Sequence, residues 1–168
     1  MSKTLVDSED ISSARVVAGD PFFGLIEDAY REFKAAPPSH LGICTCGMCM
    51  GPDRSRAALR KSPRDWTLAD VWSWSDSVKK GLDQTVWSWL LQRFLEVLAA
   101  GEGCHNGVEH LSLSWFETGK RSLWSSKQWA VLDRFAGLFM DRAMQSRSGE
   151  GSSTRCLSWH VGAGPWMT

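Results

Sequence analysis

The sequence carries no net charge and no long hydrophobic run. Its 168 residues include 19 basic and 19 acidic side chains. This balance excludes a protein that binds polyanions through bulk charge, and also a disordered acidic chain. No apolar stretch approaches the roughly 20 residues that a membrane-spanning helix needs. The polar segment Met1–Asp7 lacks the basic and apolar parts of a signal peptide, so we expect a cytoplasmic protein.

Motifs typical of catalysis are also missing. The sequence has no glycine-rich phosphate loop, no nucleophile elbow and no pair of catalytic carboxylates. His105, Glu109 and His110 come closest to a metallopeptidase motif, but three residues rather than two separate the first histidine from the glutamate. On a helix the two histidines would point about 140° apart, so they could not share a metal ion. We therefore assign no catalytic residue and favour a protein that is not an enzyme.

Tyrosine is scarce and tryptophan is abundant, with one and ten residues respectively. Each tryptophan can bury on the order of 200 Å² of surface, so a few of them suffice to fill a small helical core. Tryptophans left at the surface more often mark a protein contact than an accident of composition. Carbohydrate stacking is the alternative, but no strand-rich platform accompanies the rings. We predict that Trp74, Trp159 and Trp166 contact a partner protein.

Helical periodicity runs through the middle of the chain, and no alternating strand pattern of useful length occurs. Helices are expected to start where a capping residue precedes an apolar stripe. The expected helices run from Asp20 to the Pro37-Pro38 pair, over 53–61, 67–80, 83–100 and 106–119, and from Ser125 through Ala143. The sequence thus predicts an all-α fold, a single helical-bundle domain of about five to six helices with a Cys-containing loop.

The pattern also predicts how the chain is divided. Residues 1–19 carry no clear period and should form a flexible lead-in. The helical domain is expected over residues 20–146, and residues 147–168 should form a Gly/Ser link and a short tail that contains tryptophan. Within the domain, the segment 83–100 is apolar around most of its circumference, so it should be the most buried helix.

Three of the five cysteines lie within six residues, in a loop that contains several glycines. Zinc takes four thiolate or imidazole ligands in a tetrahedron, and closely spaced cysteines in such a loop can turn several sulfurs inward together. With the preceding histidine the loop reads H-x3-C-x-C-x2-C. This pattern predicts a structural zinc site formed by His40, Cys44, Cys46 and Cys49.

The fourth ligand and the role of the thiols stay open. Cys156 and His160 near the C-terminus are alternatives to His40, and the Cys104-His105 pair is a further one. A second C-x-x-C pair is missing, so free thiols in a reducing compartment are the competing interpretation. A redox or nucleophilic role is the third. Four protein ligands would make the site structural, whereas a catalytic zinc keeps one position open.

A basic run follows the cysteine loop and includes Arg54, Arg56 and Arg60. Beside a zinc-binding loop, such a run could contact the phosphates of a nucleic acid. The alternative is a solvated helix face, and the zero net charge of the chain favours that alternative.

Several short motifs follow one another in the middle of the chain. They are Pro37-Pro38-Ser39-His40, Cys44-Thr-Cys46, Leu91-Gln-Arg93-Phe-Leu95-Glu96-Val-Leu98-Ala99, Trp124 and Gln128-Trp-Ala-Val-Leu132. Their order resembles a set of bacterial helical proteins without an established function, in which a C-P-C-C-type loop precedes a helix of the R-x-L-E-L-L-A type. The resemblance covers roughly residues 37 to 143, and here Thr45 replaces the proline while the third cysteine is displaced to position 49. It implies an all-α fold and a bacterial origin.

Together these observations lead to a functional hypothesis. We expect a non-enzymatic bacterial protein that binds another protein, for example an immunity-type inhibitor of a toxin, with a structural zinc site. The first alternative is a metal-dependent enzyme that uses the cysteine loop with an open coordination position. The second is a nucleic-acid-binding zinc protein that uses the basic run.

Overall fold

The structure, a computed structural model, describes residues 14–103, 116 and 120–149. These residues form five α-helices and no sheet, which confirms the all-α prediction. The helices are α1 (Phe23–Glu32), α2 (Pro52–Leu59), α3 (Leu68–Asp76), α4 (Gln84–Ala99) and α5 (Ser126–Gly149). Two short 3-10 turns, η2 (Pro63–Asp65) and η5 (Arg121–Leu123), precede α3 and α5. The helix expected over 106–119 lies outside the described residues, apart from the buried Phe116.

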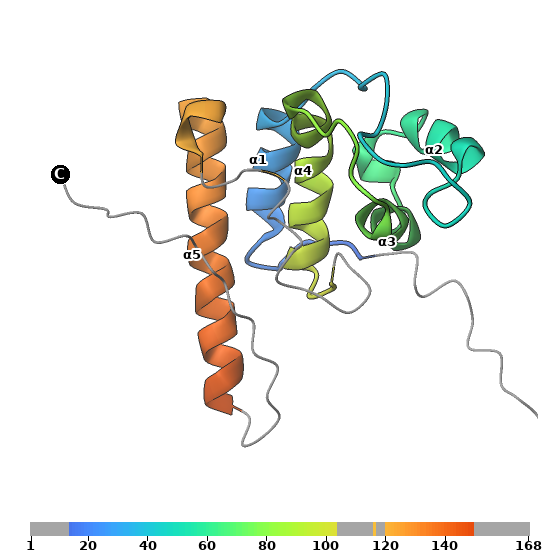
Figure 1. Ribbon diagram of the computed structural model, residues 1–168. Coiled ribbons are helices and arrows are strands. Elements are labelled where there is room, and N and C mark those ends of the chain that lie inside the picture. Colours follow the sequence, from blue (N-terminus) through green and yellow to red (C-terminus); the bar gives the residue numbers. More distant parts are fainter. Residues whose placement is uncertain (1–13, 104–115, 117–119, 150–168) are drawn as a thin grey trace, which may run out of the picture.

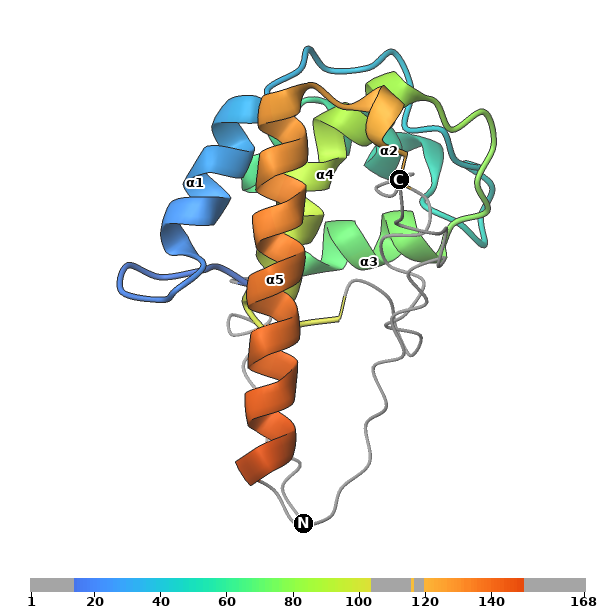
Figure 2. The ribbon, with the colours of Figure 1, turned by 90° about the vertical axis from the view of Figure 1, so that its left-hand side faces the viewer.

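Helix α4 is the centre of the fold, as its apolar circumference predicts. Every residue from Trp89 to Ala99 is buried. Helix α1 packs against both α4 and α5, and η2 packs against α4. Figures 1 and 2 show α5 on one side of α1 and α4, with α2 and α3 on the other. No helix in the described part of the chain has the length and apolarity to cross a bilayer.

Aromatic rings fill much of the space around α4. Trp66 meets Trp89 edge to face, with ring centroids 5.7 Å apart. Trp74 meets Phe94 in the same way at 5.2 Å. The prediction that Trp74 contacts a partner is therefore wrong, because its side chain is 0% exposed and its Nε1 donates a hydrogen bond to the Leu41 carbonyl at 2.9 Å. The other two tryptophans assigned to partner binding, Trp159 and Trp166, lie outside the described residues.

A charged network, here called the Glu96 network, lies inside this apolar core. The Oε2 atom of Glu96 accepts hydrogen bonds from Arg93 Nη1 at 2.6 Å and from the Tyr30 hydroxyl at 2.7 Å. Arg93 also donates to the backbone oxygens of Trp66 (2.9 Å) and Ala14 (2.7 Å). Of the three nitrogens of this guanidinium group, only Nη2 has no hydrogen-bond partner among the described residues. The network therefore joins α1, η2 and the segment before α1 to the central helix.

The segment before α1 contacts the core at its first described residue. Ala14 is buried and accepts a hydrogen bond from Arg93, whereas residues 17–19 are exposed. The flexible lead-in expected over residues 1–19 stays a prediction. Asp20 does accept a hydrogen bond from the backbone N–H of Phe22, at 2.8 Å. It caps a turn rather than the helix, since α1 begins only at Phe23.

Three helix starts follow the capping signals. Thr67 and Asp70 form a reciprocal capping box at the start of α3, and Asp83 accepts from the Val86 N–H at the start of α4. Ser125 and Gln128 cap α5 in the same reciprocal way, at 3.0 and 3.2 Å. The ends are predicted less well. Helix α3 stops at Asp76 instead of near residue 80, and α5 continues to Gly149, into the segment expected to be a link.

Candidate metal centre

The loop that carries the cysteines, residues 41–50, pairs with the linker between α3 and α4. Cys44 N–H donates to the Val78 carbonyl and Lys80 N–H donates to the Gly42 carbonyl, both at 2.7 Å. These bonds flank an isolated antiparallel bridge between Ile43 and Lys79. The same pairing explains the early end of α3, because residues that continued the helix could not lie extended against the loop.

Gly42 makes this pairing possible. Its φ of +64° lies in the left-handed region, which residues with a side chain rarely adopt. A Cβ atom there would also lie 2.9 Å from the Cα of Leu82, which is backbone and cannot move aside. The sequence therefore needs a glycine between the histidine and the first cysteine.

The other end of the loop is held just as firmly. Met50 is buried, and its N–H donates to the Ser77 Oγ at 2.8 Å. That hydroxyl in turn donates to the Ser73 carbonyl at 2.7 Å. Lys79 adds a third tie, since its ammonium donates to the carbonyls of Trp74, Ser75 and Ser77 at 2.8 to 3.0 Å and closes the C-terminal end of α3. Both ends of the loop are thus fixed against α3.

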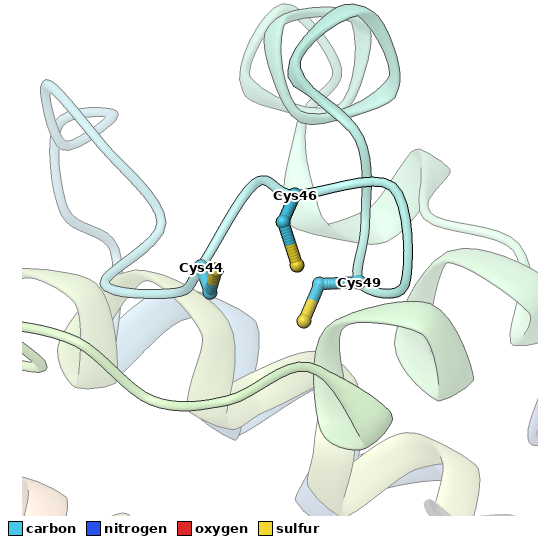
Figure 3. Close-up of side chains that lie close together, drawn as sticks. All are labelled: Cys44, Cys46 and Cys49. Carbon is cyan, nitrogen blue, oxygen red and sulfur yellow. The ribbon is translucent and has the colours of Figure 1, made fainter.

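Three thiols converge between these anchors. The sulfur atoms of Cys44, Cys46 and Cys49 all lie within 4.8 Å of one another. Figure 3 shows the three side chains on one loop, with the sulfurs of Cys46 and Cys49 directed into the same space. With Zn–S bonds of about 2.3 Å, two sulfurs of a tetrahedral zinc site lie about 3.8 Å apart. The cluster could therefore hold a metal ion after only small movements of the side chains.

Their surroundings make the three thiols unequal. A hydrogen bond from the Met48 backbone, helped by the Cys44 and Cys49 thiols, lowers the pKa of Cys46 to about 7. A hydrogen bond from the Val78 backbone lowers the pKa of Cys49, but burial and the neighbouring sulfurs outweigh it and leave that pKa raised. Cys46 is also the exposed member of the three, while the other two are half-buried. Of these two thiols, Cys46 has the lower pKa and so ionises more readily near neutral pH.

His40 does not belong to this cluster, so the predicted set of four ligands is wrong at this position. Its Nδ1 accepts a hydrogen bond from the Gly42 N–H at 3.0 Å, and the side chain is exposed. In the part of the chain that the structure describes, no carboxylate or imidazole joins the three sulfurs. The alternative ligands Cys156 and His160, and the Cys104-His105 pair, lie outside the described residues.

The basic run after the loop is largely paired with acidic or carbonyl groups. Arg54 donates to the Ala69 carbonyl at 2.9 Å, and Arg56 forms an ion pair with Asp53. Arg60 is exposed at the end of α2. This pairing leaves little free positive charge for phosphates, so it does not favour a nucleic-acid interface.

The residues that hold the loop, especially Ser77 and Lys79, gave no recognisable signal in the sequence. Ser77 follows a helix with no motif of its own, and Lys79 has the appearance of an ordinary surface cation. The glycine before the first cysteine was the available clue, since a glycine at a fixed offset from a ligand often marks a turn that needs a positive φ.

No protein-family model, curated protein or solved structure matches this chain. The resemblance to bacterial helical proteins over residues 37 to 143 therefore stays a prediction.

Proposed function

We propose that this chain is a zinc-binding protein in which Cys44, Cys46 and Cys49 supply three of the four ligands. The observation that carries the proposal is the convergence of three sulfurs within 4.8 Å on a loop anchored at both ends. Thiolate ligands select soft or borderline ions such as Zn²⁺ over Mg²⁺ or Ca²⁺. Cys44 lies where the loop pairs with the α3–α4 linker, and Cys46 and Cys49 flank the loop tip. An ion bound by all three would therefore hold the tip close to that linker.

The proposed role of the ion is structural. A catalytic zinc needs an open position and a nearby group that can move a proton. The described residues place no carboxylate or imidazole among the sulfurs. This favours a non-enzymatic protein over a metal-dependent enzyme.

Metal analysis of the full-length protein, purified without a chelator or a histidine tag, tests the proposal. We expect about one zinc ion per chain. The zinc content should fall in each of the variants Cys44→Ser, Cys46→Ser and Cys49→Ser. It should not fall in His40→Ala, because His40 precedes the first cysteine but lies outside the cluster of thiols. A loss of zinc in Cys156→Ser or in His160→Ala would identify that residue as the fourth ligand. Reduced protein that fails to take up added Zn²⁺ would refute the proposal.

The loop also offers a surface for a protein partner. Met48, at the loop tip between two cysteines, is 98% exposed. Val78, on the linker that pairs with the loop, is 61% exposed. Exposed apolar side chains beside a rigid loop are typical of protein contacts. This observation supports binding of another protein at the loop.

A comparison of two methionines tests partner binding. Met48→Asp should abolish capture of a specific partner, while Met140→Asp on α5, where the native side chain is 45% exposed, should leave capture unchanged. If the partner is an enzyme, its inhibition by the wild type and not by Met48→Asp would support an immunity-type role. Equal capture by both variants would exclude the loop as the contact.

A further inference from the structure

Cys46 and Cys49 are arranged as a pair within the three-thiol cluster. The Cys49 N–H donates to the Cys46 carbonyl at 3.0 Å, which closes a four-residue turn. Such a turn brings its first and last α-carbons within about 7 Å, and a disulfide spans α-carbons about 4.4 to 6.8 Å apart. Their sulfurs already lie within 4.8 Å of each other and occupy the same side of the loop in Figure 3.

Cys44 is less suited to a disulfide. Its N–H is fixed by the hydrogen bond to the Val78 carbonyl, in the part of the loop that pairs with the linker. Only one residue separates it from Cys46, so a bond between these two would have to distort that pairing. Between Cys46 and Cys49, by contrast, lie only Gly47 and the exposed Met48. Closing that pair moves a solvent-exposed turn and no core residue.

We propose that Cys46 and Cys49 form a reversible disulfide when a peroxide reaches the loop, and that this oxidation releases the metal. The release of the metal rests on the proposed zinc site, whereas the disulfide itself can form in the metal-free chain. Its observable basis is the turn, the proximity of the sulfurs and the exposure of Cys46.

The chemistry balances with hydrogen peroxide as the oxidant. The Cys46 sulfur attacks one peroxide oxygen, the O–O bond breaks, and a sulfenic acid and one water form. The Cys49 sulfur then attacks the Cys46 sulfur and displaces the hydroxyl, which leaves as a second water. Two electrons pass from the two sulfurs to the peroxide. In the metal-free chain both thiol protons end in water. In the zinc-bound chain the sulfurs are thiolates, so solvent supplies the two protons and Zn²⁺ leaves as the disulfide forms. A thiol reductant reverses the step by exchange.

Release of the metal follows from the loss of ligands. The disulfide removes two of the three thiolates, so only Cys44 remains in the cluster. A single thiolate cannot hold Zn²⁺ against competition from a chelator or from other thiols.

Mass spectrometry of the full-length protein tests the disulfide. Trypsin should release residues 35–54 as one peptide that contains all three cysteines, since no Lys or Arg lies between Lys34 and Arg54. One equivalent of hydrogen peroxide should lower the mass of this peptide by about 2 Da. Within this peptide, alkylation before reduction should then label Cys44 alone. Cys44→Ser should retain the mass loss, and Cys46→Ser and Cys49→Ser should lose it.

Metal release is measured in the same samples with a chromogenic chelator. We expect zinc to appear together with the disulfide and to be taken up again after reduction. A bridge that includes Cys44, oxidation to sulfinic acid without a disulfide, or zinc retained in the oxidised protein would each overturn the inference. If the Cys46–Cys49 disulfide forms in protein that never binds zinc, the regulatory role and the proposed zinc site both fail, while the disulfide itself stands. If zinc binds and no disulfide forms, only this inference fails.

Discussion

The Glu96 network and the cysteine loop satisfy their polar groups in opposite ways. In the network, a buried carboxylate and a buried guanidinium are held by one another, by a tyrosine and by backbone oxygens. In the loop, backbone hydrogen bonds fix one end and the Ser77 hydroxyl fixes the other, but the three thiols between them have only each other and nearby backbone groups. The first arrangement pairs its two opposite charges with each other inside the core. The second gathers three possible metal ligands with no charged partner among them, which is an arrangement suited to binding a cation.

Removing one member of the Glu96 network should have the largest effect. Glu96→Ala leaves the Arg93 guanidinium buried without its counter-ion, and breaking a buried pair in this way costs about 3–5 kcal/mol. Urea unfolding at neutral pH measures the loss. The double variant Arg93→Met with Glu96→Leu should recover part of the stability, because apolar residues of similar size can replace both charges. Recovery is incomplete because the Tyr30 hydroxyl and the carbonyls of Ala14 and Trp66 lose their partners. A single variant as stable as the wild type would show that the network contributes nothing.

Removal of the metal should have the next largest effect. A ligand that binds only the folded state at 100 times its dissociation constant stabilises that state by about 2.7 kcal/mol. A chelator should therefore lower the unfolding temperature of the zinc-loaded protein and leave that of Cys46→Ser unchanged. Hydrogen exchange should become faster at the Cys44 and Lys80 amides, whose bonds hold the loop to the linker. If hydrogen exchange becomes faster only in α5, the metal does not bind at the cysteine loop.

Substitution of the two loop glycines should show that the anchored end of the loop, at Gly42, matters more for stability than the loop tip, at Gly47. Gly42→Ala introduces a side chain at a φ of +64° and 2.9 Å from the backbone of Leu82, so it should cost about 2 kcal/mol and weaken zinc binding. Gly47→Ala has open space around its Cβ and should change stability by less than about 0.5 kcal/mol. Thermal unfolding and zinc titration of the two variants check this difference. Equal effects would mean that the Gly42 turn does not position the thiols.

Local signals in the sequence were enough to predict the all-α fold, several helix starts and the central helix. The Thr67 and Asp83 caps and the apolar circumference of α4 depend on neighbouring residues only, and the structure confirms them. The three cysteines are also local, so their convergence could be expected from spacing.

Features that depend on contacts between distant segments could not be predicted in this way. The Ile43–Lys79 bridge joins residues 36 positions apart and involves no periodic strand. Trp74 was placed at the surface because nothing near it shows that Leu41 supplies a buried acceptor. His40 was counted as a ligand because its spacing fits, whereas the turn at Gly42 engages its ring nitrogen instead. The burial of Arg93 could not be predicted because two of its partners, the carbonyls of Ala14 and Trp66, lie in distant parts of the sequence.

An effect smaller than that of Gly42→Ala is expected at Asp70, where it depends on pH. Burial raises the pKa of this carboxyl, but hydrogen bonds from Lys61 and Thr67 outweigh it and leave the pKa below the ordinary 3.8. Because the folded-state pKa is the lower one, the stabilisation is complete above about pH 4 and is lost as the pH falls through the folded value. Asp70→Asn should therefore cost about 1 kcal/mol at pH 7, since the side chain of Lys61 is partly exposed and the ion pair is screened. In urea unfolding, the difference between the two proteins should shrink as the pH falls from about 4 to 2. A difference that stays constant over this range would assign the effect to the capping geometry of Thr67 rather than to the charge.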